Sequence, residues 1–224
     1  MTKPNTFKEL FKNNTFLTDI SEVAMPSAMT ESACESMFEG CTNLQYGLTS
    51  LPAGSLEKKS YKAMFKNCTR LTNTPTLVCD ATVFATECFA HMFEGCTSME
   101  DVMELDLNNK CIMSDLYDNG SEMEAMYKGC THLTTGYEYI NCGYTKYCFR
   151  EMFMGCTALE TPTLLGDTTY VPINYYDDNG NDIATEFVNS LKTRCCERMY
   201  ANSGVTSIDY PSANGVYQDY AYDE

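Results

Sequence analysis

The chain has 224 residues, of which 44% are hydrophobic, and its 15 basic and 31 acidic residues give a formal net charge of −16. This composition predicts one globular domain, and the charge argues against nucleic acid or anionic membrane as partners, because both need clustered lysine and arginine. The sequence contains no run of about 18 apolar residues, so we expect no membrane-spanning helix. The opening "MTKPNTFKELFKNN" shows no signal peptide, so it is either a native cytoplasmic start or the result of trimming.

One nonapeptide recurs along the chain. It reads "MFEGCTNLQ" at 37–45, "MFKNCTRLT" at 64–72, "MFEGCTSME" at 92–100 and "MFMGCTALE" at 152–160. When the aromatic residue of each copy is numbered position 0, the copies fall at Phe11, Phe38, Phe65, Phe93, Tyr127, Phe153 and Tyr200. The intervals are 27, 27, 28, 34, 26 and 47 residues. Self-similarity at this period predicts a solenoid, in the range of leucine-rich repeats.

The residues before each aromatic predict a short helix. Apolar side chains at positions −4, −1 and 0 have the spacing of one helical face. A cysteine at position +3 and a leucine or methionine at +6 continue the apolar pattern. The predicted structural core of the repeat consists of Met37, Phe38, Cys41, Leu44, Met64, Phe65, Cys68, Leu71, Met92, Phe93, Cys96, Met126, Tyr127, Cys130, Leu133, Met152, Phe153, Cys156 and Leu159.

Position +2 is Gly or Asn in every copy. These two residues best tolerate the left-handed backbone conformation at a helix C-terminus. The sequence therefore predicts that each helix stops at the same step. The helix-stop residues are Gly40, Asn67, Gly95, Gly129, Gly155 and Asn202, and Asn13 occupies the same position in the first copy.

Short extended stretches follow the stops. The clearest are "LTNTPTL" at 71–77 and "LETPTL" at 159–164, which we interpret as strands that stack from repeat to repeat. The predicted fold is an α/β solenoid over residues 1–209, with six to seven short helix–turn–strand coils. In the outer copies Asn14 and Ser203 replace the cysteine, as expected for capping repeats that face solvent.

The two long intervals contain insertions that centre on Asn-Gly. This dipeptide between extended flanks is typical of β-hairpins, so we expect hairpins near 112–121 and 168–188. Insertions in solenoids often carry binding sites, and the candidate binding residues are Tyr175, Tyr176, Asp177, Asp178 and Asn179. With Gly180 at loop position six, "DDNGND" fails the EF-hand calcium template, although a looser calcium site stays open. The acidic, Tyr-rich tail at 210–224 is either disordered or an arm that orders on a partner.

The 13 cysteines do not resemble a disulfide scaffold or a zinc site. Their number is odd, no CxxC pair occurs, and His91 and His132 are isolated. We interpret the repeated cysteines as free, buried thiols that act as small apolar side chains. If the thiol of Cys96 has no partner, its replacement by serine should cost about 1–3 kcal/mol of stability.

The columns "M-F-x-G-C-T-x-L", exemplified by Met37 to Leu44, resemble the BspA-type leucine-rich repeat family of bacterial surface proteins over roughly residues 6–209. The resemblance implies a right-handed, leucine-rich-repeat-like stack with a structural or recognition role and no catalytic residues. Such repeats occur in secreted adhesins of gut and oral Bacteroidales. Similar cysteine-bearing repeats occur in virion proteins of tailed phages that infect those bacteria.

Three classes of function compete. A virion surface component, such as a head decoration, fibre or tail-associated protein, fits the compact size, the thiols and the acidic tail. A secreted bacterial cell-surface adhesin fits the family but usually carries a signal sequence and an anchor. An enzyme is disfavoured because no catalytic triad, phosphate loop or metal-ligand spacing is present. We therefore expect a non-enzymatic protein without cofactor or metal that contacts virion proteins or a host surface protein or glycan. Self-association as a homo-oligomer stays open. The expected location is the virion, or alternatively the bacterial surface.

Overall fold

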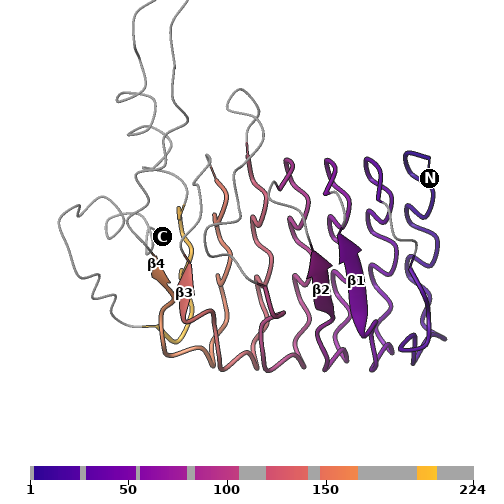
Figure 1. Ribbon diagram of the computed structural model, residues 1–224. Helices are drawn as coiled ribbons and strands as arrows, with labels where there is room; N and C mark the ends of the chain where they lie inside the picture. The colour runs from indigo at the N-terminus through magenta and orange to yellow at the C-terminus, as the bar shows by residue number, and fades with distance from the viewer. Residues whose placement is uncertain are drawn as a thin grey trace, which may run out of the picture.

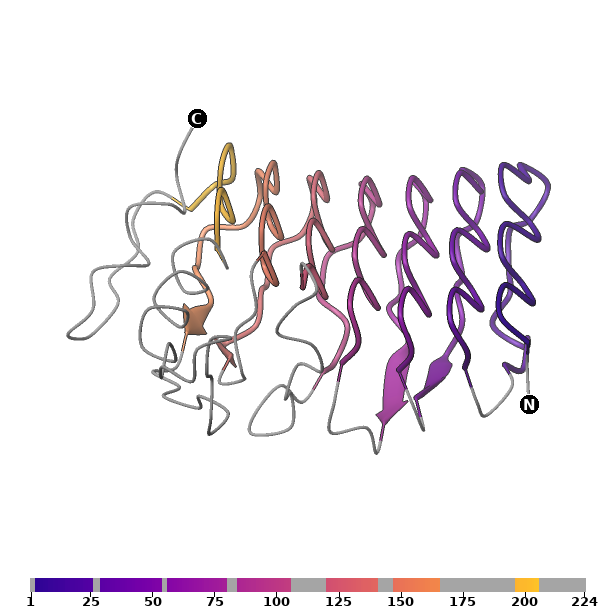
Figure 2. The same cartoon turned by 90° about the horizontal axis from the view of Figure 1, so that it is seen from above.

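The computed structural model describes residues 3–25, 29–53, 56–79, 84–105, 120–140, 147–165 and 196–205 (Figure 1). Within these ranges, segments of similar path lie side by side in chain order (Figures 1 and 2). Each contains a run of consecutive turns, which we call a turn segment. The described turn segments are 4–13, 31–40, 58–67, 86–95, 122–129, 147–155 and 196–202.

The predicted short helices are wrong: the described part of the chain contains turns where they were expected, and no helix. Alternate N–H groups bond to the carbonyl three residues earlier, as Met37 N does to Cys34 O at 3.2 Å. The N–H groups between them reach the next segment, as Phe38 N does to Met64 O at 2.9 Å. No helix is long and apolar enough to cross a membrane among the described residues.

The backbone dihedrals separate this ribbon of turns from a helix. Positive φ recurs at every fourth residue, for example at Ser32 (52°), Ser36 (54°) and Gly40 (74°). A right-handed helix has negative φ throughout, and non-glycine residues in the left-handed region cost about 1–2 kcal/mol each. A ten-residue helix is marginal by itself. Hydrogen bonds and packing between adjacent turn segments offset the left-handed cost, so the segments form only as a stack.

An aromatic ladder runs through the core of the stack. Consecutive rings at position 0 lie parallel, with centroids 5.5–5.7 Å apart and interplanar angles of 4–8°. All the predicted core residues listed above are buried. The period of the turns, four residues, buries pairs of neighbours such as Ala33 with Cys34 and Met37 with Phe38. Over eight residues this pattern also fits a helix, which explains the misassignment.

The strands on the opposite side of each coil are short. Strand β1 (Ser50–Ala53) pairs in parallel with β2 (Thr76–Cys79), and β3 (Tyr139–Ile140) pairs in parallel with β4 (Leu164–Leu165). Isolated bridges join Asp19 to Tyr46 and Leu56 to Phe84. The extended stretches predicted at 71–77 and 159–164 therefore enter β2 and β4 only at their ends.

Tyrosines in the turn segments connect the two sides across the core. The Tyr127 hydroxyl accepts a hydrogen bond from the N–H of Met103 at 3.0 Å, and the Tyr200 hydroxyl accepts one from the N–H of Thr163 at 2.8 Å. The Tyr61 hydroxyl donates to the Pro52 carbonyl. These bonds satisfy buried backbone groups, which gives tyrosine a role that phenylalanine in the same column cannot perform.

Candidate functional site

The repeated cysteine is the first candidate for chemistry, and its geometry makes it structural. Each thiol at position +3 donates to the carbonyl of the aromatic residue in the preceding turn segment, with Sγ···O distances of 3.1 Å. The five bonds join Cys41 to Phe11, Cys68 to Phe38, Cys96 to Phe65, Cys130 to Phe93 and Cys156 to Tyr127. The column is thus a ladder of thiol–carbonyl bonds parallel to the aromatic ladder.

These thiols are poorly suited to nucleophilic catalysis. Burial raises the pKa of Cys156 to about 12 and holds the pKa of Cys96 well above its ordinary value. The thiolate is the nucleophilic form, so a raised pKa suppresses it. The described cysteines of the column, and also Cys34, are free of disulfides. The predicted effect of replacing Cys96 by serine assumed that the thiol has no partner. That assumption is wrong, because the Cys96 thiol donates a hydrogen bond to the Phe65 carbonyl.

Position +2 has positive φ in all described copies, from 56° at Asn202 to 75° at Gly95 and Gly155. The left-handed conformation is therefore present at Gly40, Asn67, Gly95, Gly129, Gly155 and Asn202. These residues do not stop helices, because each is the last of the positive-φ positions in a turn segment. A Cβ on Gly95 would lie 2.4 Å from Asn67 Oδ1, so glycine in this copy leaves room for the asparagine side chain of the copy before it.

The predicted binding insertion cannot be placed. Tyr175, Tyr176, Asp177, Asp178 and Asn179 lie outside the described residues, as do the 210–224 tail and the expected hairpin at 168–188. The other hairpin, near 112–121, is described only at Gly120 and Ser121. Both of these residues have positive φ, of 63° and 60°, and they lead into the turn segment 122–129.

No group of three or more metal-ligating side chains gathers in the part of the chain that the structure describes. The two histidines have local partners. His91 Nδ1 lies 2.7 Å from Glu94 Oε2, and His132 Nδ1 lies 2.6 Å from the carbonyl oxygen of Thr97. Both imidazole rings therefore contact oxygen atoms of nearby residues in the stack.

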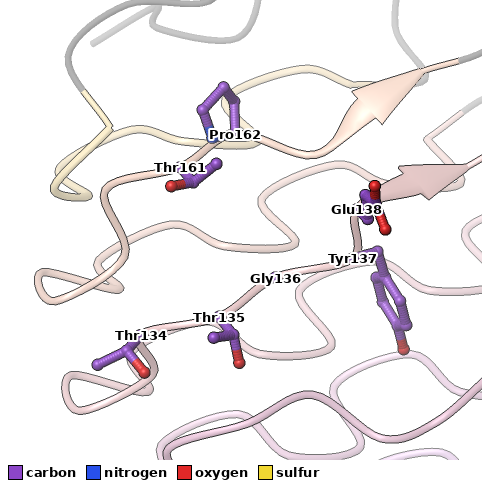
Figure 3. A pocket seen from close by; sticks show the side chains of 7 residues that line it. All are labelled: Thr134, Thr135, Gly136, Tyr137, Glu138, Thr161 and Pro162. Atoms are coloured by element: carbon purple, nitrogen blue, oxygen red, sulfur yellow. The ribbon is translucent and has the colours of Figure 1, made fainter.

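A hollow of about 460 Å³ opens on the strand side of the later coils. Figure 3 shows Thr161 and Pro162 on one segment and the remaining lining residues on the segment beside it. The lining residues are Thr134, Thr135, Gly136, Tyr137, Glu138, Thr161 and Pro162. A Cβ on Gly136 would lie 3.2 Å from Oγ1 of the buried Thr163, so the glycine permits a close approach of the two segments beside the hollow.

Most polar groups of this hollow already have partners in the stack. Thr135 Oγ1 donates to Asp101 Oδ1 at 2.6 Å, and the Tyr137 hydroxyl donates to the Met103 carbonyl at 3.1 Å. Thr134 Oγ1 contacts the Glu100 carbonyl at 3.4 Å. The exposed Glu138 carboxylate remains to accept hydrogen bonds from a ligand. Most of the lining surface is apolar, so the hollow suits weak contact with an extended chain, and its lining residues include no paired nucleophile and base.

Rows of ion pairs cover the outer surface of the turn segments, and sequence reasoning missed them. At position +1 the charge alternates over the first five copies, from Lys12 to Lys128, which pairs Lys12 with Glu39 at 3.1 Å and Lys66 with Glu94 at 2.8 Å. At position −3, Lys8 pairs with Glu35 at 3.1 Å. Reading these columns across copies would have revealed the alternation. Each exposed pair contributes less than about 1 kcal/mol, but opposite charges one period apart favour this register over a shifted one.

Glu94 shows how these pairs act on ionisation. Burial disfavours its charged form, but hydrogen bonds from His91 and Lys66 outweigh this and lower the pKa of Glu94 to about 2. The carboxylate therefore stays charged through the mildly acidic range. We call these ion pairs between adjacent copies the electrostatic seam.

Comparisons with protein-family models, curated proteins and solved structures give no match to this chain. The resemblance to BspA-type repeats therefore remains a prediction from the motif.

Proposed function

We propose that this protein is a non-enzymatic structural and interaction protein, and specifically a surface component of a phage virion such as a head decoration, fibre or tail-associated protein. The observation that supports this most directly is the use of the chemically capable side chains. Thiols, threonine hydroxyls and tyrosine hydroxyls in the described copies bond from one copy to the next. Thiols and hydroxyls that are hydrogen-bonded between copies stabilise the stack and are not available to react with a substrate.

The proposed architecture is a right-handed solenoid of the BspA type, modified by turn segments in place of helices. Its support is the repeated register of hydrogen bonds, with Phe11 N bonded to Met37 O and Phe153 N bonded to Met199 O, both at 2.9 Å. A solenoid of this kind presents a long outer surface, which suits assembly or attachment.

A secreted bacterial cell-surface adhesin is the second candidate. The hollow that Thr161, Pro162 and Glu138 line in part is the observation that favours it, because an open hollow can accept a segment of host protein or glycan. Loss of adhesion on the Glu138→Lys change, with unchanged folding, would support this reading.

The decisive experiment is localisation. Particles purified by density gradient and the cell-surface fraction of the same culture are analysed by quantitative mass spectrometry, and intact particles are labelled with antibody for electron microscopy. We expect peptides of this chain at a fixed ratio to the major capsid protein, with label on the particle surface. Recovery in the cell-surface fraction, with none in particles, would refute the virion role and favour the adhesin.

A further inference from the structure

Two copies of the repeat carry a glycine at position +9, Gly47 in one and Gly136 in the other. The surroundings of the two glycines correspond. A Cβ on Gly47 would lie 2.9 Å from Leu71, the leucine at position +6 of the next copy, and a Cβ on Gly136 would lie 3.6 Å from its equivalent, Leu159. The two glycines therefore occupy the same place in the stack, and the side chains beside them can be compared directly.

The backbone of Gly47 is hydrogen-bonded by a side chain of the next copy. Oδ1 of Asn73, at position +8, accepts a hydrogen bond from the Gly47 N–H at 2.6 Å. Nδ2 of Asn73 donates to the Leu48 carbonyl at 3.3 Å and lies 3.5 Å from the Gly47 carbonyl oxygen. One carboxamide thus serves backbone groups of both signs, and Gly47 is buried.

At Gly136 the equivalent place is the hollow (Figure 3). Position +8 of the next copy is Thr161, whose side chain ends one atom earlier than asparagine and carries no amide. Neither the N–H nor the carbonyl of Gly136 forms a hydrogen bond in the described structure, and Gly136 is only half-buried. The space of about 460 Å³ therefore adjoins a backbone donor and a backbone acceptor that the chain leaves unpaired.

A second polar group beside Gly136 also lacks a partner. Thr163 is fully buried and its Oγ1 forms no hydrogen bond. That atom would lie 3.2 Å from a Cβ on Gly136. Buried polar atoms are nearly always hydrogen-bonded in folded proteins. The junction between these two copies thus holds unpaired polar groups on both of its segments.

We propose that the hollow binds a primary carboxamide, namely the side chain of an asparagine or glutamine in an extended peptide of a partner protein. The amide oxygen accepts a hydrogen bond from the Gly136 N–H, and the amide nitrogen donates to the Gly136 carbonyl, in the arrangement that Asn73 adopts at Gly47. The apolar part of the lining, which includes Pro162, packs against the rest of the peptide.

The geometry of the amide selects this ligand over an N-acetylated sugar. A primary amide holds one N–H on the same edge as its oxygen, so both atoms can meet one glycine. An N-acetyl group or a peptide bond is trans, and its N–H and oxygen point to opposite edges. Such a group leaves either the Gly136 N–H or the Gly136 carbonyl unpaired. The inference rests on the interaction role proposed above and holds for either location.

Titrations followed by ¹H–¹⁵N NMR test the assignment with three probes. The first is a short peptide with a central asparagine, acetylated and capped as the N-methylamide so that it contains no other primary amide. The second has aspartate in place of asparagine, and the third is N-acetylglucosamine. The asparagine peptide should shift the Gly136 amide resonance and bind about tenfold or more tighter than the other two, since each of these leaves one glycine group unpaired.

A reciprocal pair of variants tests the comparison between copies. Thr161→Asn should supply the amide from the chain itself, which abolishes the peptide-induced shift at Gly136 and raises the melting temperature. Asn73→Thr should open a second site, seen as a peptide-induced shift of the Gly47 amide resonance. Thr42→Asn makes the same change as Thr161→Asn on an exposed threonine away from the hollow, and it should leave binding unchanged.

The absence of a Gly136 shift at saturating peptide, equal binding of the aspartate peptide, or tighter binding of N-acetylglucosamine would overturn the proposal. Unchanged peptide binding by folded Thr161→Asn would do the same. If that variant does not fold, Asn73→Thr decides, because a chain with no second site contradicts the equivalence of the two glycines. None of these failures alters the localisation experiment, so they are distinguishable from failure of the proposed function.

Discussion

The turn side and the strand side of the stack follow different rules. On the turn side, the five copies that carry the cysteine repeat the same thiol–carbonyl contact of 3.1 Å, and the rings of neighbouring copies are spaced by 5.5–5.7 Å. On the strand side, β1 and β2 have four residues each, while β3 and β4 have two. Repeat intervals from 26 to 47 residues are therefore accommodated after the turn segment.

This difference shows where a repeat protein can vary. The turn segments hold half of their N–H groups in bonds to a neighbour, so one added residue would shift every later bond out of register. The described residues on the strand side carry fewer such bonds, and loops of this kind tolerate insertion. The turn side thus sets the spacing of the stack. Four experiments, in order of decreasing expected effect, test whether the contacts on the turn side determine the stability of the fold.

The largest expected effect is alkaline unfolding, because the buried thiols in the turn segments and directly after them act together. Burial raises the pKa of Cys34 and Cys156 to about 12, and also raises the pKa of Cys68, Cys96 and Cys130, from an ordinary value of 9.0. Above pH 9 the unfolded chain loses these protons while the folded chain retains them. Stability is therefore complete below that pH and falls as the pH rises, by about 1.4 kcal/mol per unit for each thiol.

Urea unfolding at a series of pH values measures this slope. Cys96→Ala removes one thiol and should make the alkaline decline less steep. Stability that stays constant well above pH 9 would contradict the buried-thiol ladder.

Phe93→Ala should have the next largest effect. It removes a fully buried ring that stacks on Phe65 at 5.6 Å and on Tyr127 at 5.6 Å. The expected loss is about 3–5 kcal/mol, from lost burial and the cavity left behind. Phe16→Ala, at a side chain that is 92% exposed, is the control and should change the free energy of unfolding by less than about 0.5 kcal/mol. Equal losses for the two variants in chemical denaturation would disprove the ladder's role.

A pair of glycine substitutions tests the contact between copies. Gly95 and Gly129 have φ of 75° and 74°, so alanine costs about 1–2 kcal/mol at either position through backbone strain. Only Gly95→Ala adds a clash, 2.4 Å from Asn67 Oδ1, whereas the nearest atom at Gly129 is 4.0 Å away. Gly95→Ala should therefore be the more destabilising by thermal denaturation. Adding Asn67→Gly should remove the excess; if the two alanine variants melt alike, the steric argument fails.

Glu94→Gln should have the smallest effect. The lowered pKa of Glu94 means that its ionised form stabilises the fold above its ordinary value of 4.5, and this contribution is lost as the pH falls from there toward 2. The side chain is 21% exposed, so solvent screening limits the loss at neutral pH to below about 1 kcal/mol. The variant should also show a flatter acid limb when stability is measured against pH. If Glu94→Gln lowered the free energy of unfolding more than Phe93→Ala does, the ion pairs would contribute more to stability than the buried rings, contrary to this prediction.

The sequence predicted the core residues well, because the same repeat positions must hold apolar side chains in every copy. Met92, Phe93 and Cys96 recur at fixed steps since each copy buries the same positions against its neighbours, and all three are fully buried. The predicted helix failed for a specific reason. Apolar residues at −4, −1 and 0 satisfy both a period of 3.6 and a period of four, and eight residues are too few to distinguish them.

The candidate site was less accessible to sequence reasoning. The hollow beside Gly136 and Pro162 combines two copies, so no single stretch of sequence contains it. The thiol of Cys96 also finds its acceptor 31 residues earlier, in the Phe65 carbonyl, and a backbone acceptor leaves no mark in the residue pattern.

By itself, the sequence determined which residues repeat, which of them are buried and where the backbone needs glycine or asparagine, because these properties belong to individual positions. Only the tertiary structure decided that the repeat forms turns in place of helices. A turn segment leaves half of its N–H groups without an internal acceptor, and these are satisfied only when the next copy is present. The conformation of each segment is therefore fixed by its neighbours in the stack.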